Sequence, residues 1–542
     1  MLCPRWRRQL QSCLVALRGG RSGQVLGDTL SGDGAEGLSI DAPEAGEANR
    51  RRKRFLSSIL TLSAGSTASQ VITLALMPVI TRLYDPAMFG IFAVFVALAN
   101  IIIRVSNLQF AETIVVVPSE EDAEAAAQLA ITIVAFFAVF IGAVGLLFSA
   151  PLAQFFGIEP YGIYFAILAF AIFLGGLRQV LRRWLLRAHG NRYIASGEVS
   201  QALADRVATI AGFWLSPGTP NGLVIGRLTG QLCDVLAMLR GVIGNPPRLS
   251  LDQPRREHMK ALAGEYRQFA LYSWANLLDN AAQQLPVIMI NALLGPTVAG
   301  GVALARRVLA EPAIILGSAL AQSYYQLAAK EDDESALRSV TATMTFTLFK
   351  LIALPVLLGM CCAPELFAVV FSEKWRIAGW YALIVSPIFM LTLLLRPLNR
   401  IFFVQRIQRE RGIYAIQNIL VIVVALVPAA FIDNEMIVLA VYSGCSSLYL
   451  LYRGLWLLGR VSISPRDVLL SCYLSLLLAL VGAVVAVLAR RAFEGNDLLI
   501  VAVVVSVVLA YLAALLLVDT EVRKSLQGVL GKKFGKKSNG NN

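Results

Sequence analysis

Residues 82–105 read RLYDPAMFGIFAVFVALANIIIRV, a proline-bearing turn followed by an apolar run with no charge until Arg104. About 20 apolar residues allow an α-helix to cross ~30 Å of hydrocarbon at 1.5 Å per residue. The run therefore predicts a membrane-spanning helix. Arg104 lies near its end, where a long side chain can reach the membrane surface.

The rest of the chain has the same character. Of its 542 residues, 57% are hydrophobic and 15% are charged, and the mean hydropathy is +0.66. A soluble chain carries roughly 25% charged residues. The composition therefore indicates an all-α, polytopic membrane protein. Fourteen segments have the length and apolarity of a span, near residues 57–80, 88–107, 127–149, 161–180, 195–215, 221–239, 271–294, 298–321, 339–362, 376–395, 413–432, 435–456, 467–488 and 497–518.

The basic residues predict the orientation. An even number of spans places both termini on one side, and most of the 48 lysines and arginines then lie on that side, which identifies it as cytoplasmic. The net charge of +13 follows from this arrangement and gives no reason to expect nucleic acid as a partner. The segment 108–126, with four acids after Pro118, is an exception; acidic residues count little in the rule, so we still predict a cytoplasmic loop.

Two terminal segments differ from the spans. Residues 1–54 end in the cluster RRRKR and are predicted to be a disordered, basic cytoplasmic tail, with the cluster held near anionic lipid. Its segment RWRRQLQSCLVAL has too short an apolar part for a signal peptide. Residues 521–542 are predicted to be a second basic cytoplasmic tail.

A short repeat suggests an internal duplication. The pattern L-x-x-P-x-x-x-G-x-x-A occurs in 82–94 and in 292–304, and each copy joins the first two spans of a set of six. Coincidence is the alternative, because proline at a helix start and glycine at a helix contact are common in membrane proteins. The matched residues are Leu83, Pro86, Gly90 and Ala93 in the first copy and Leu293, Pro296, Gly300 and Ala303 in the second.

A duplication divides the chain into two lobes of six helices. We predict a first lobe at 55–240, a cytoplasmic linker at 241–270 and a second lobe at 271–460. Two extra helices follow at 461–520.

The sequence gives no sign of a metal site, a cofactor or an enzyme. The seven cysteines form no C-x-x-C pair, and the adjacent Cys361 and Cys362 are more typical of membrane packing than of redox chemistry. The two histidines, His189 and His258, both lie in basic loops. No nucleotide-binding glycine motif is present, so ATP is not expected as the energy source. The longest predicted periplasmic loop, 363–375, is too short for a catalytic domain.

Several charged residues lie deep within predicted spans. Because an ionisable group at bilayer depth costs at least ~2.5 kcal/mol, it normally faces a partner or a water-filled cavity. Four of them are predicted to line a cationic substrate cavity: Arg306, Arg206, Lys350 and Arg227. Four others are predicted to couple an ion or to form ion pairs: Asp279, Glu311, Asp205 and Arg307.

Structural ion pairs are the alternative for these groups. Arg227 and Asp234 are seven residues apart on one helix, and Arg307 and Glu311 are four apart, so either pair could form on a helix face. We expect Glu311 to hold Arg307, while Arg306, about 100° away on the helix, binds the substrate. Asp279 has no basic neighbour in the sequence and is therefore the predicted proton carrier. Pro312 weakens the helix beside Arg306 and Arg307, as in broken helices at transport sites.

Several stretches, taken in order, resemble a known family. They are PVITRLYDPAMFGIFAVFVAL, FAETIVVVPSEEDA, EYRQFALYSWANLLDNAAQQLPVIMINALLGP, ARRVLAEPAIILGSALAQSYYQ and FSEKWRIAGWYALIVSPIFMLTLLLRPLNRIFFVQRIQ. These are similar to the polysaccharide-transport flippases, the Wzx-type O-antigen and exopolysaccharide exporters of the multidrug/oligosaccharidyl-lipid/polysaccharide superfamily. The resemblance covers about residues 57–460. It departs at Gln109, where the family leads us to expect a basic residue.

The resemblance implies a V-shaped pair of lobes in the bacterial inner membrane that moves a polyprenyl-pyrophosphate-linked oligosaccharide to the periplasmic leaflet. Its expected partners are this lipid-linked sugar, the bilayer, and the polymerase and chain-length machinery of lipopolysaccharide or capsule synthesis. The aromatic residues Tyr272, Trp274, Tyr324 and Tyr325 could stack against sugars or anchor the protein at the interface. A peptidoglycan-precursor flippase and a multidrug exporter of the same superfamily remain alternatives, although the deep charges of this chain favour an anionic cargo.

Overall fold

The computed structural model describes residues 44–244, 256–309, 342–343, 345–347, 349–353, 356, 359–398, 408–460 and 463–518. Within these ranges all regular secondary structure is helical, which confirms the predicted all-α fold. Residues 1–55 and 56–542 form two separate units, and helix α2 (Glu44–Ala75) begins in the first and ends in the second. The structure is described below for the residues after Phe55.

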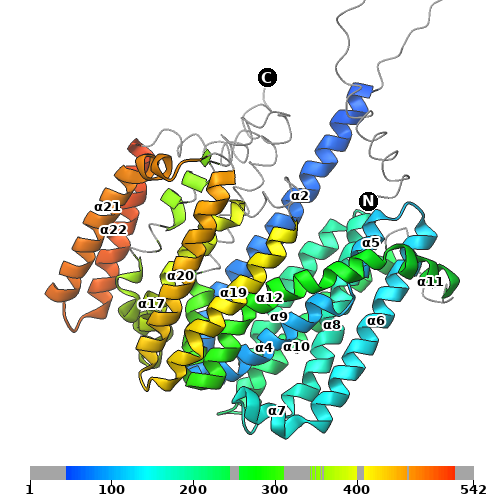
Figure 1. Cartoon of the computed structure of the whole chain (residues 1–542), viewed down its shortest axis with the longest axis horizontal. Coiled ribbons are helices and arrows are strands. Elements are labelled where there is room, and N and C mark those ends of the chain that lie inside the picture. Colours follow the sequence, from blue (N-terminus) through cyan, green and yellow to red (C-terminus); the bar gives the residue numbers. More distant parts are fainter. Residues whose placement is uncertain are drawn as a thin grey trace, which may run out of the picture. The chain divides into compact units, whose positions relative to one another are not determined.

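The first helix group comprises the helices from α2 to α10 (Figure 1). Within it α9 packs on α10, α6 on α8, and α8 on α10. Glycines allow the closest of these approaches: a Cβ atom at Gly226 of α10 would lie 2.0 Å from Thr209 Oγ1 of α9. After α2 the helices are α3 (Met77–Leu83), α4 (Pro86–Val105), α5 (Phe110–Val116), α6 (Glu120–Leu147), α7 (Ser149–Phe156), α8 (Tyr164–Arg187), α9 (Asn191–Leu215) and α10 (Asn221–Gly244).

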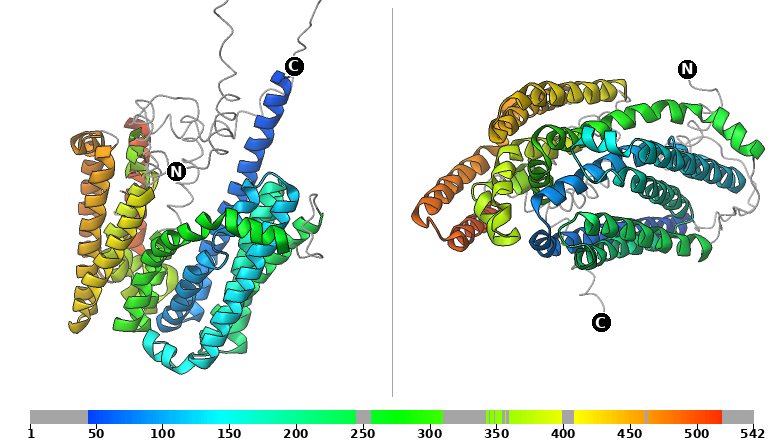
Figure 2. Two further views of the ribbon diagram at one scale, coloured as in Figure 1. Left: turned by 45° about the vertical axis from the view of Figure 1, so that its right-hand side comes forward. Right: turned by 90° about the horizontal axis from the view of Figure 1, so that it is seen from below.

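The second helix group runs from α12 to α20. Helix α17 packs on α16 and α20, and α12 packs on α19 (Figures 1 and 2). Its members are α12 (Arg267–Leu294), a helix at 296–309, the π-helical turn η1 (Phe349–Ala353), α16 (Ala363–Phe371), η2 (Glu373–Trp375), α17 (Arg376–Leu398), α19 (Gln408–Leu426), η3 (Pro428–Phe431) and α20 (Glu435–Arg460).

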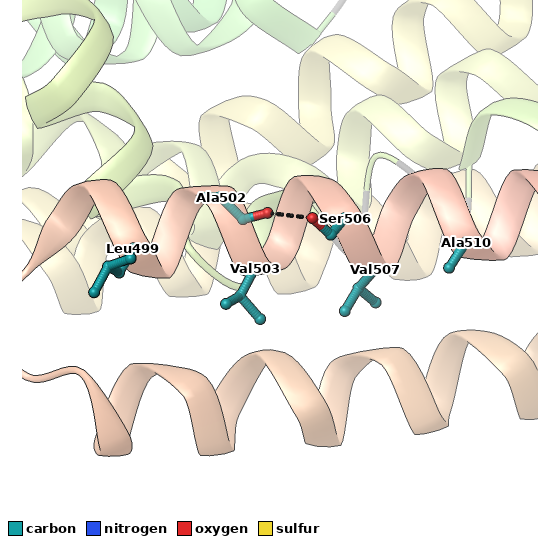
Figure 3. Close-up of a pocket in the computed structure, with 6 residues that line it drawn as sticks. All are labelled: Leu499, Ala502, Val503, Ser506, Val507 and Ala510. Carbon is teal, nitrogen blue, oxygen red and sulfur yellow. Dashed lines mark hydrogen bonds between the residues drawn. The ribbon is translucent and has the colours of Figure 1, made fainter.

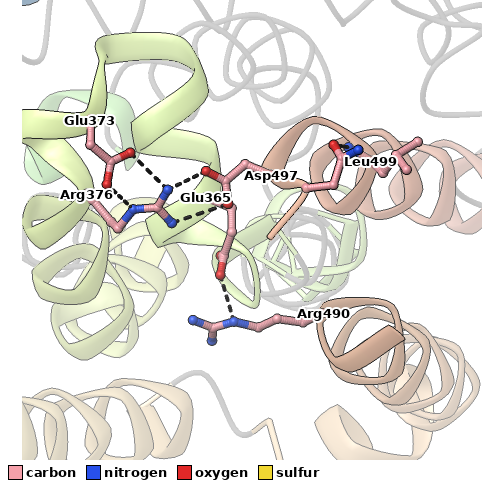
Figure 4. A network of polar contacts seen from close by, with 7 residues as sticks. Glu365, Glu373, Arg376, Arg490, Asp497 and Leu499 are labelled. Atoms are coloured by element: carbon pink, nitrogen blue, oxygen red, sulfur yellow. Dashed lines mark hydrogen bonds and ion pairs between the residues drawn. The ribbon is translucent and has the colours of Figure 1, made fainter. Parts of the chain in front are cut away.

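Helices α21 (Pro465–Ala492) and α22 (Asp497–Val518) form a hairpin that ion pairs fasten to the second group. Arg490 at the end of α21 pairs with the buried Glu365 of α16 through Nε and Oε1, 2.7 Å apart. Arg376, which begins α17, pairs with Asp497 at the start of α22 and with Glu373 (Figure 4). The turn between the two helices is therefore held at two points.

Twelve of the fourteen predicted spans coincide with helices of the described chain, although only nine of those helices are strongly apolar. Nine helical segments of the described chain are long and apolar enough to cross a membrane. The fifth, seventh and eleventh predicted spans are the long helices α9, α12 and α19, which contain several charged and amide side chains and so fall outside that set. The eighth and ninth predicted spans lie partly outside the described residues. The count of fourteen stays a prediction.

The acidic segment 108–126 is mostly helix, and the expected loop is therefore wrong in its local structure. Helix α5 occupies its first part, and Ser119 then caps α6, its Oγ accepting from the Asp122 amide at 3.0 Å. The acids after Pro118 form the first turn of α6, where negative charge favours the positive end of the helix dipole. Arg187 of α8 donates to the Ile114 and Val117 carbonyls at 2.8 and 2.6 Å.

The linker predicted at 241–270 contains a helix that packs on the first group. Helix α11 (Arg256–Glu265) buries Leu262 in the apolar cluster that includes Phe110 and Ile114. His258 Nδ1 lies 3.4 Å from Asp122 Oδ1 at the start of α6. Burial, and then the nearby Glu265 and Asp122 carboxylates, raises the pKa of the Tyr266 phenol, which stays neutral.

The largest buried apolar cluster crosses between the two groups. It joins Phe89 and Phe92 of α4 to Leu304 of the 296–309 helix, Phe367 of α16 and Trp375 of η2. The ring of Trp375 is fully buried and meets Phe89 edge-on, with centroids 5.0 Å apart. The two groups therefore share a core at the end of the bundle that holds the α3–α4 turn.

Candidate functional site

Several charged residues of the first group form an internal network between α8, α9 and α10. Asp234 of α10 is completely buried and forms an ion pair with Arg178 of α8. When the Gln201 amide is oriented to satisfy both of its ends, Nε2 donates to Asp234 Oδ2 at 3.0 Å and Oε1 accepts from Arg227 Nη1 at 3.2 Å. The network thus links Arg227 to Asp234 through an amide.

A direct ion pair between Arg227 and Asp234 is the alternative that their spacing in the sequence allows. In this network the two residues are linked only through Gln201. Both residues lie on α10, but Asp234 turns toward α8, where Arg178 neutralises it. The second Asp234 oxygen lies against Gly197 of α9: a Cβ atom there would be 2.3 Å from Oδ1. The choice of partner is set by which helix lies opposite, and not by spacing along α10.

Asp205 and Arg206 of α9 are part of the same buried region. Arg206 is 6% exposed, and its Nη2 lies 3.9 Å from Asp205 Oδ2. Asp205 Oδ1 also accepts from Thr209 Oγ1 at 3.3 Å. Asp205 and Arg206 act electrostatically on Arg227, so the structure brings these three predicted site residues together.

In the second group Asp279 has a basic partner. Arg411 of α19 donates through Nη2 to Asp279 Oδ2 of α12 at 2.9 Å, and each side chain is about one third exposed. Arg453 of α20 also lies close enough to interact with both charges. The Asp279 carboxylate therefore lies in the field of two guanidinium groups. Asp279 was predicted to take up protons because it has no basic neighbour in the sequence. In the structure Arg411 is such a neighbour, so this reason no longer applies.

Arg306 reaches the next turn of α12. Its Nη1 donates to the Gln283 carbonyl at 2.9 Å, one helical turn beyond Asp279. Pro286 lies within α12 and leaves the Ala282 carbonyl, next to that of Gln283, without its helical donor. Arg306 also acts electrostatically on Tyr442 of α20. It therefore lies where α12, α20 and its own helix meet.

Arg307 points in a different direction, as the helix geometry predicts. Its guanidinium lies over the Phe92 ring of α4, 5.9 Å from the centroid, and so contacts the first group. The predicted partner Glu311 and the neighbouring Pro312 lie outside the described residues. The pairing of Arg307 with Glu311 stays a prediction.

Lys350 lies apart from the other cations that the sequence singled out. It is 8% exposed and belongs to the π-helical turn η1, whose Lys350 carbonyl accepts from the Tyr511 hydroxyl of α22 at 3.0 Å. This places it beside the C-terminal hairpin. Of the four candidate aromatics, Trp274 is half exposed, and the side chains of Tyr272, Tyr324 and Tyr325 are outside the described residues.

Three arginines of these clusters were missed in the sequence. Arg178, Arg411 and Arg453 all lie near the ends of predicted spans, where the positive-inside rule already accounts for basic residues. A signal was available for Arg411, since an acid at bilayer depth such as Asp279 requires a cation. The sequence could not say which arginine supplies it.

Residues 79–398 match the family described as polysaccharide biosynthesis protein. The chain belongs to this family. The match covers more than half of the chain and includes Arg306, Asp279 and the network of α8–α10. The membership predicted from the resemblance is therefore confirmed. No curated protein matches the chain.

Solved structures show the fold of this polysaccharide biosynthesis protein. The lipid II flippase MurJ in an inward closed conformation is 13% identical, with a TM-score of 0.64 over 84% of this chain and 99% of that one. A multidrug resistance transporter of the MATE family in an inward-facing conformation is 16% identical, with a TM-score of 0.49 over 74% and 94%. At 13% identity the first similarity shows a shared fold.

This polysaccharide biosynthesis protein also has an apolar groove on α22, away from the charged clusters. Leu499, Val503 and Val507 line it, and Ser506 there satisfies itself by donating to the Ala502 carbonyl at 2.8 Å (Figure 3). The groove contains no charged side chain. It therefore offers nothing to bind a phosphate.

Proposed function

We propose that this protein is a flippase that moves polyprenyl-pyrophosphate-linked oligosaccharides from the cytoplasmic to the periplasmic leaflet of the bacterial inner membrane. It would serve the synthesis of O-antigen, capsule or exopolysaccharide and work by alternating access. The lipid tail of this cargo can stay in the bilayer, but its pyrophosphate and sugars cannot cross ~30 Å of hydrocarbon unaided. The protein must therefore supply a polar, cationic path.

The observation that carries the proposal is the group of three guanidinium groups gathered along α12. Arg411 pairs with Asp279, Arg453 lies close enough to interact with both, and Arg306 donates to a backbone carbonyl one turn away. A carbonyl is a weaker partner for a guanidinium than a phosphate, because the phosphate oxygens are negatively charged and two of them can accept parallel N–H bonds from one guanidinium. Pyrophosphate can therefore displace the Gln283 carbonyl from Arg306. Arg206, Arg227 and Lys350 are secondary candidates for contact with the cargo.

Deletion of the gene tests the substrate class. We expect lipid-linked oligosaccharide to accumulate on the cytoplasmic side while surface polysaccharide is lost, as measured by mass spectrometry of extracted lipids and by gel analysis of the polymer. Normal polymer with altered drug resistance would instead indicate a multidrug exporter. Accumulated peptidoglycan precursor would favour the second candidate, a lipid II flippase, which the structural similarity to MurJ supports.

Substitution of Arg306 tests the site. We expect Arg306→Ala to lower complementation at least a hundredfold at normal membrane abundance, and Arg306→Lys to recover part of it, because lysine cannot meet phosphate with a bidentate fork. Arg240→Ala, at an exposed position of α10, is the matched control and should complement fully. Full complementation by Arg306→Ala would mean that Arg306 does not bind the cargo and has only a structural role at the Gln283 carbonyl of α12.

Reporter fusions test the proposed orientation. Fusions at residues 218 and 434 should score as periplasmic, and fusions at 190 and 540 as cytoplasmic, because the basic residues are concentrated on the second side. Alkaline phosphatase and fluorescent-protein activities measure this. A reversal at 190 and 218 would contradict the topology.

A further inference from the structure

The two copies of the L-x-x-P-x-x-x-G-x-x-A repeat lie directly against each other. A Cβ atom at Gly90 would lie 1.8 Å from the Pro296 carbonyl oxygen, and one at Gly300 would lie 1.8 Å from the Pro86 carbonyl oxygen. The contact is reciprocal: the glycine of each copy receives the proline of the other. Such reciprocity is the mark of a two-fold related interface. Here the interface joins α4 of the first group to the 296–309 helix of the second.

The second group also caps the end of α3. The Arg82 carbonyl cannot accept a helical hydrogen bond from residue 86, because Pro86 has no N–H. Lys374 Nζ donates to this carbonyl at 3.0 Å and to Asp85 Oδ1 at 2.9 Å. The indole Nε1 of Trp375 donates to the Thr81 carbonyl at 2.8 Å. The terminal carbonyls of a first-group helix thus find their donors in the second group.

A second cap of the same kind holds α7. Asn291, which is 1% exposed near the end of α12, donates through Nδ2 to the Phe156 carbonyl at 2.6 Å and to the Gly157 carbonyl at 3.2 Å. Gly157 ends α7 in the left-handed conformation, with φ of 62°. At both helix ends the donors come from the second group and the acceptors are carbonyls of the first.

All these contacts lie in turns on the side of the membrane that the predicted topology makes periplasmic. They are the turn between α3 and α4, the turn before Pro296, the end of α7 and the turn at Ser372–Trp375. The glycine crossing brings backbone against backbone, so no long side chains must disengage when it opens. Water can replace each donor to a helix-end carbonyl once the groups separate.

We infer that the Gly90–Gly300 crossing, together with the caps from Lys374, Trp375 and Asn291, is a gate that closes the two helix groups at the periplasmic end and opens in each transport cycle. The inference rests on the proposed flippase function. It adds the residues that hold the closed state and a reason for the glycine in both copies of the repeat. Pro86 frees the Arg82 carbonyl that Lys374 caps, and each glycine admits the other helix.

Labelling of a buried cysteine measures the gate without a transport assay. Thr81 is fully buried beside Trp375, so Thr81→Cys, in a background with the seven native cysteines replaced, should react slowly with a membrane-impermeant maleimide. Gly90→Ala should raise the labelling rate at least tenfold, because its methyl group displaces the Pro296 backbone. Trp375→Phe keeps a ring against Phe89 but loses the donor, and should raise the rate about fivefold.

A helical glycine with free space around it gives the matched control. Gly444 of α20 has no atom within 4 Å of an added Cβ, so Gly444→Ala should leave the labelling rate unchanged. Equal rates in the Gly90→Ala, Trp375→Phe and Gly444→Ala proteins would overturn the gate. This comparison stands even if deletion of the gene shows that the cargo is not a polysaccharide precursor.

Cross-linking separates a gate from a permanent anchor. Asp85→Cys and Lys374→Cys introduced together replace the ion pair across the two groups, and a short reducible bifunctional thiol reagent should join them. We expect the bridged protein to lose at least nine tenths of its transport and to regain it on reduction, while each single cysteine variant is unaffected by the reagent. Unchanged transport in fully bridged protein would mean that this contact never opens, and would overturn the inference.

Discussion

The charged clusters of the two helix groups differ in burial and in balance. In the first group Asp234 is completely buried, paired with Arg178 and bridged by Gln201 to Arg227. In the second, Asp279 and Arg411 are 36% and 33% exposed, and Arg453 adds a further guanidinium beside the same carboxylate.

This difference separates a structural role from a binding role. A buried ion pair is costly to break, because removal of one partner leaves an uncompensated charge inside the protein. A partly exposed ion pair is worth little in stability, and its arginine can exchange the carboxylate for another anion. We therefore expect the Arg178–Asp234 pair to control folding and the second cluster to control transport, while Arg206 and Arg227 stay secondary candidates for contact with the cargo.

The largest effect on stability should come from Arg178. Arg178→Ala leaves Asp234 unpaired at a position with no exposure, and the loss of one partner of a buried pair costs about 3–5 kcal/mol. We expect membrane abundance and the melting temperature in detergent to fall sharply. The joint substitution of Arg178 and Asp234 by leucine should recover much of the loss. If the Arg178→Ala protein reaches normal abundance in the membrane but does not transport, this cluster binds the cargo and its main role is not structural.

Arg411 should show the opposite pattern. Because its pair with Asp279 is one third exposed, Arg411→Ala should cost about 1 kcal/mol or less in stability. Transport should still fall at least tenfold, measured as polymer formed per unit of protein in the membrane, and Arg411→Lys should retain part of it. A drop in abundance as large as that of Arg178→Ala would erase the distinction between the clusters.

Asp279→Asn sharpens the same comparison. The substitution removes the carboxylate that holds Arg411 while it keeps the side-chain size. If Asp279 only orients Arg411, transport should change about threefold or less, equally at every pH tested. A selective loss of its dependence on the proton gradient would restore the original assignment of Asp279 as the proton carrier.

The smallest effect is expected at the rim of the first cluster. Arg182 Nη1 lies 2.6 Å from Glu198 Oε1, and the two side chains are 37% and 13% exposed. Arg182→Ala should lower the free energy of unfolding by about 0.5–1 kcal/mol with little change in transport, since Arg182 is more than one third exposed and its pair is partly screened by water. Thermal denaturation of the purified protein checks this value.

The sequence by itself determined which segments become helices and which residues are unusual. Apolar runs of about 20 residues lie in helices wherever the structure describes them, because a membrane helix satisfies all its backbone hydrogen bonds within its own segment. The same runs made the charges of Asp205, Asp279 and Arg306 conspicuous. The Pro-x-x-x-Gly pattern could also be found in the sequence, because proline and glycine each change what the backbone can do at their own position.

Only the tertiary structure decided which of these residues meet. Spacing within one helix suggested that Asp234 pairs with Arg227. Its ion-pair partner is instead Arg178 of α8, which packs on α10 although α9 lies between them in the sequence. Asp279 finds Arg411 132 positions away along the chain. Helix geometry fixes contacts three or four residues apart, whereas contacts between helices depend on which faces pack together. That packing also brought Gly90 against Pro296 and Gly300 against Pro86, so the two copies of the sequence repeat contact each other.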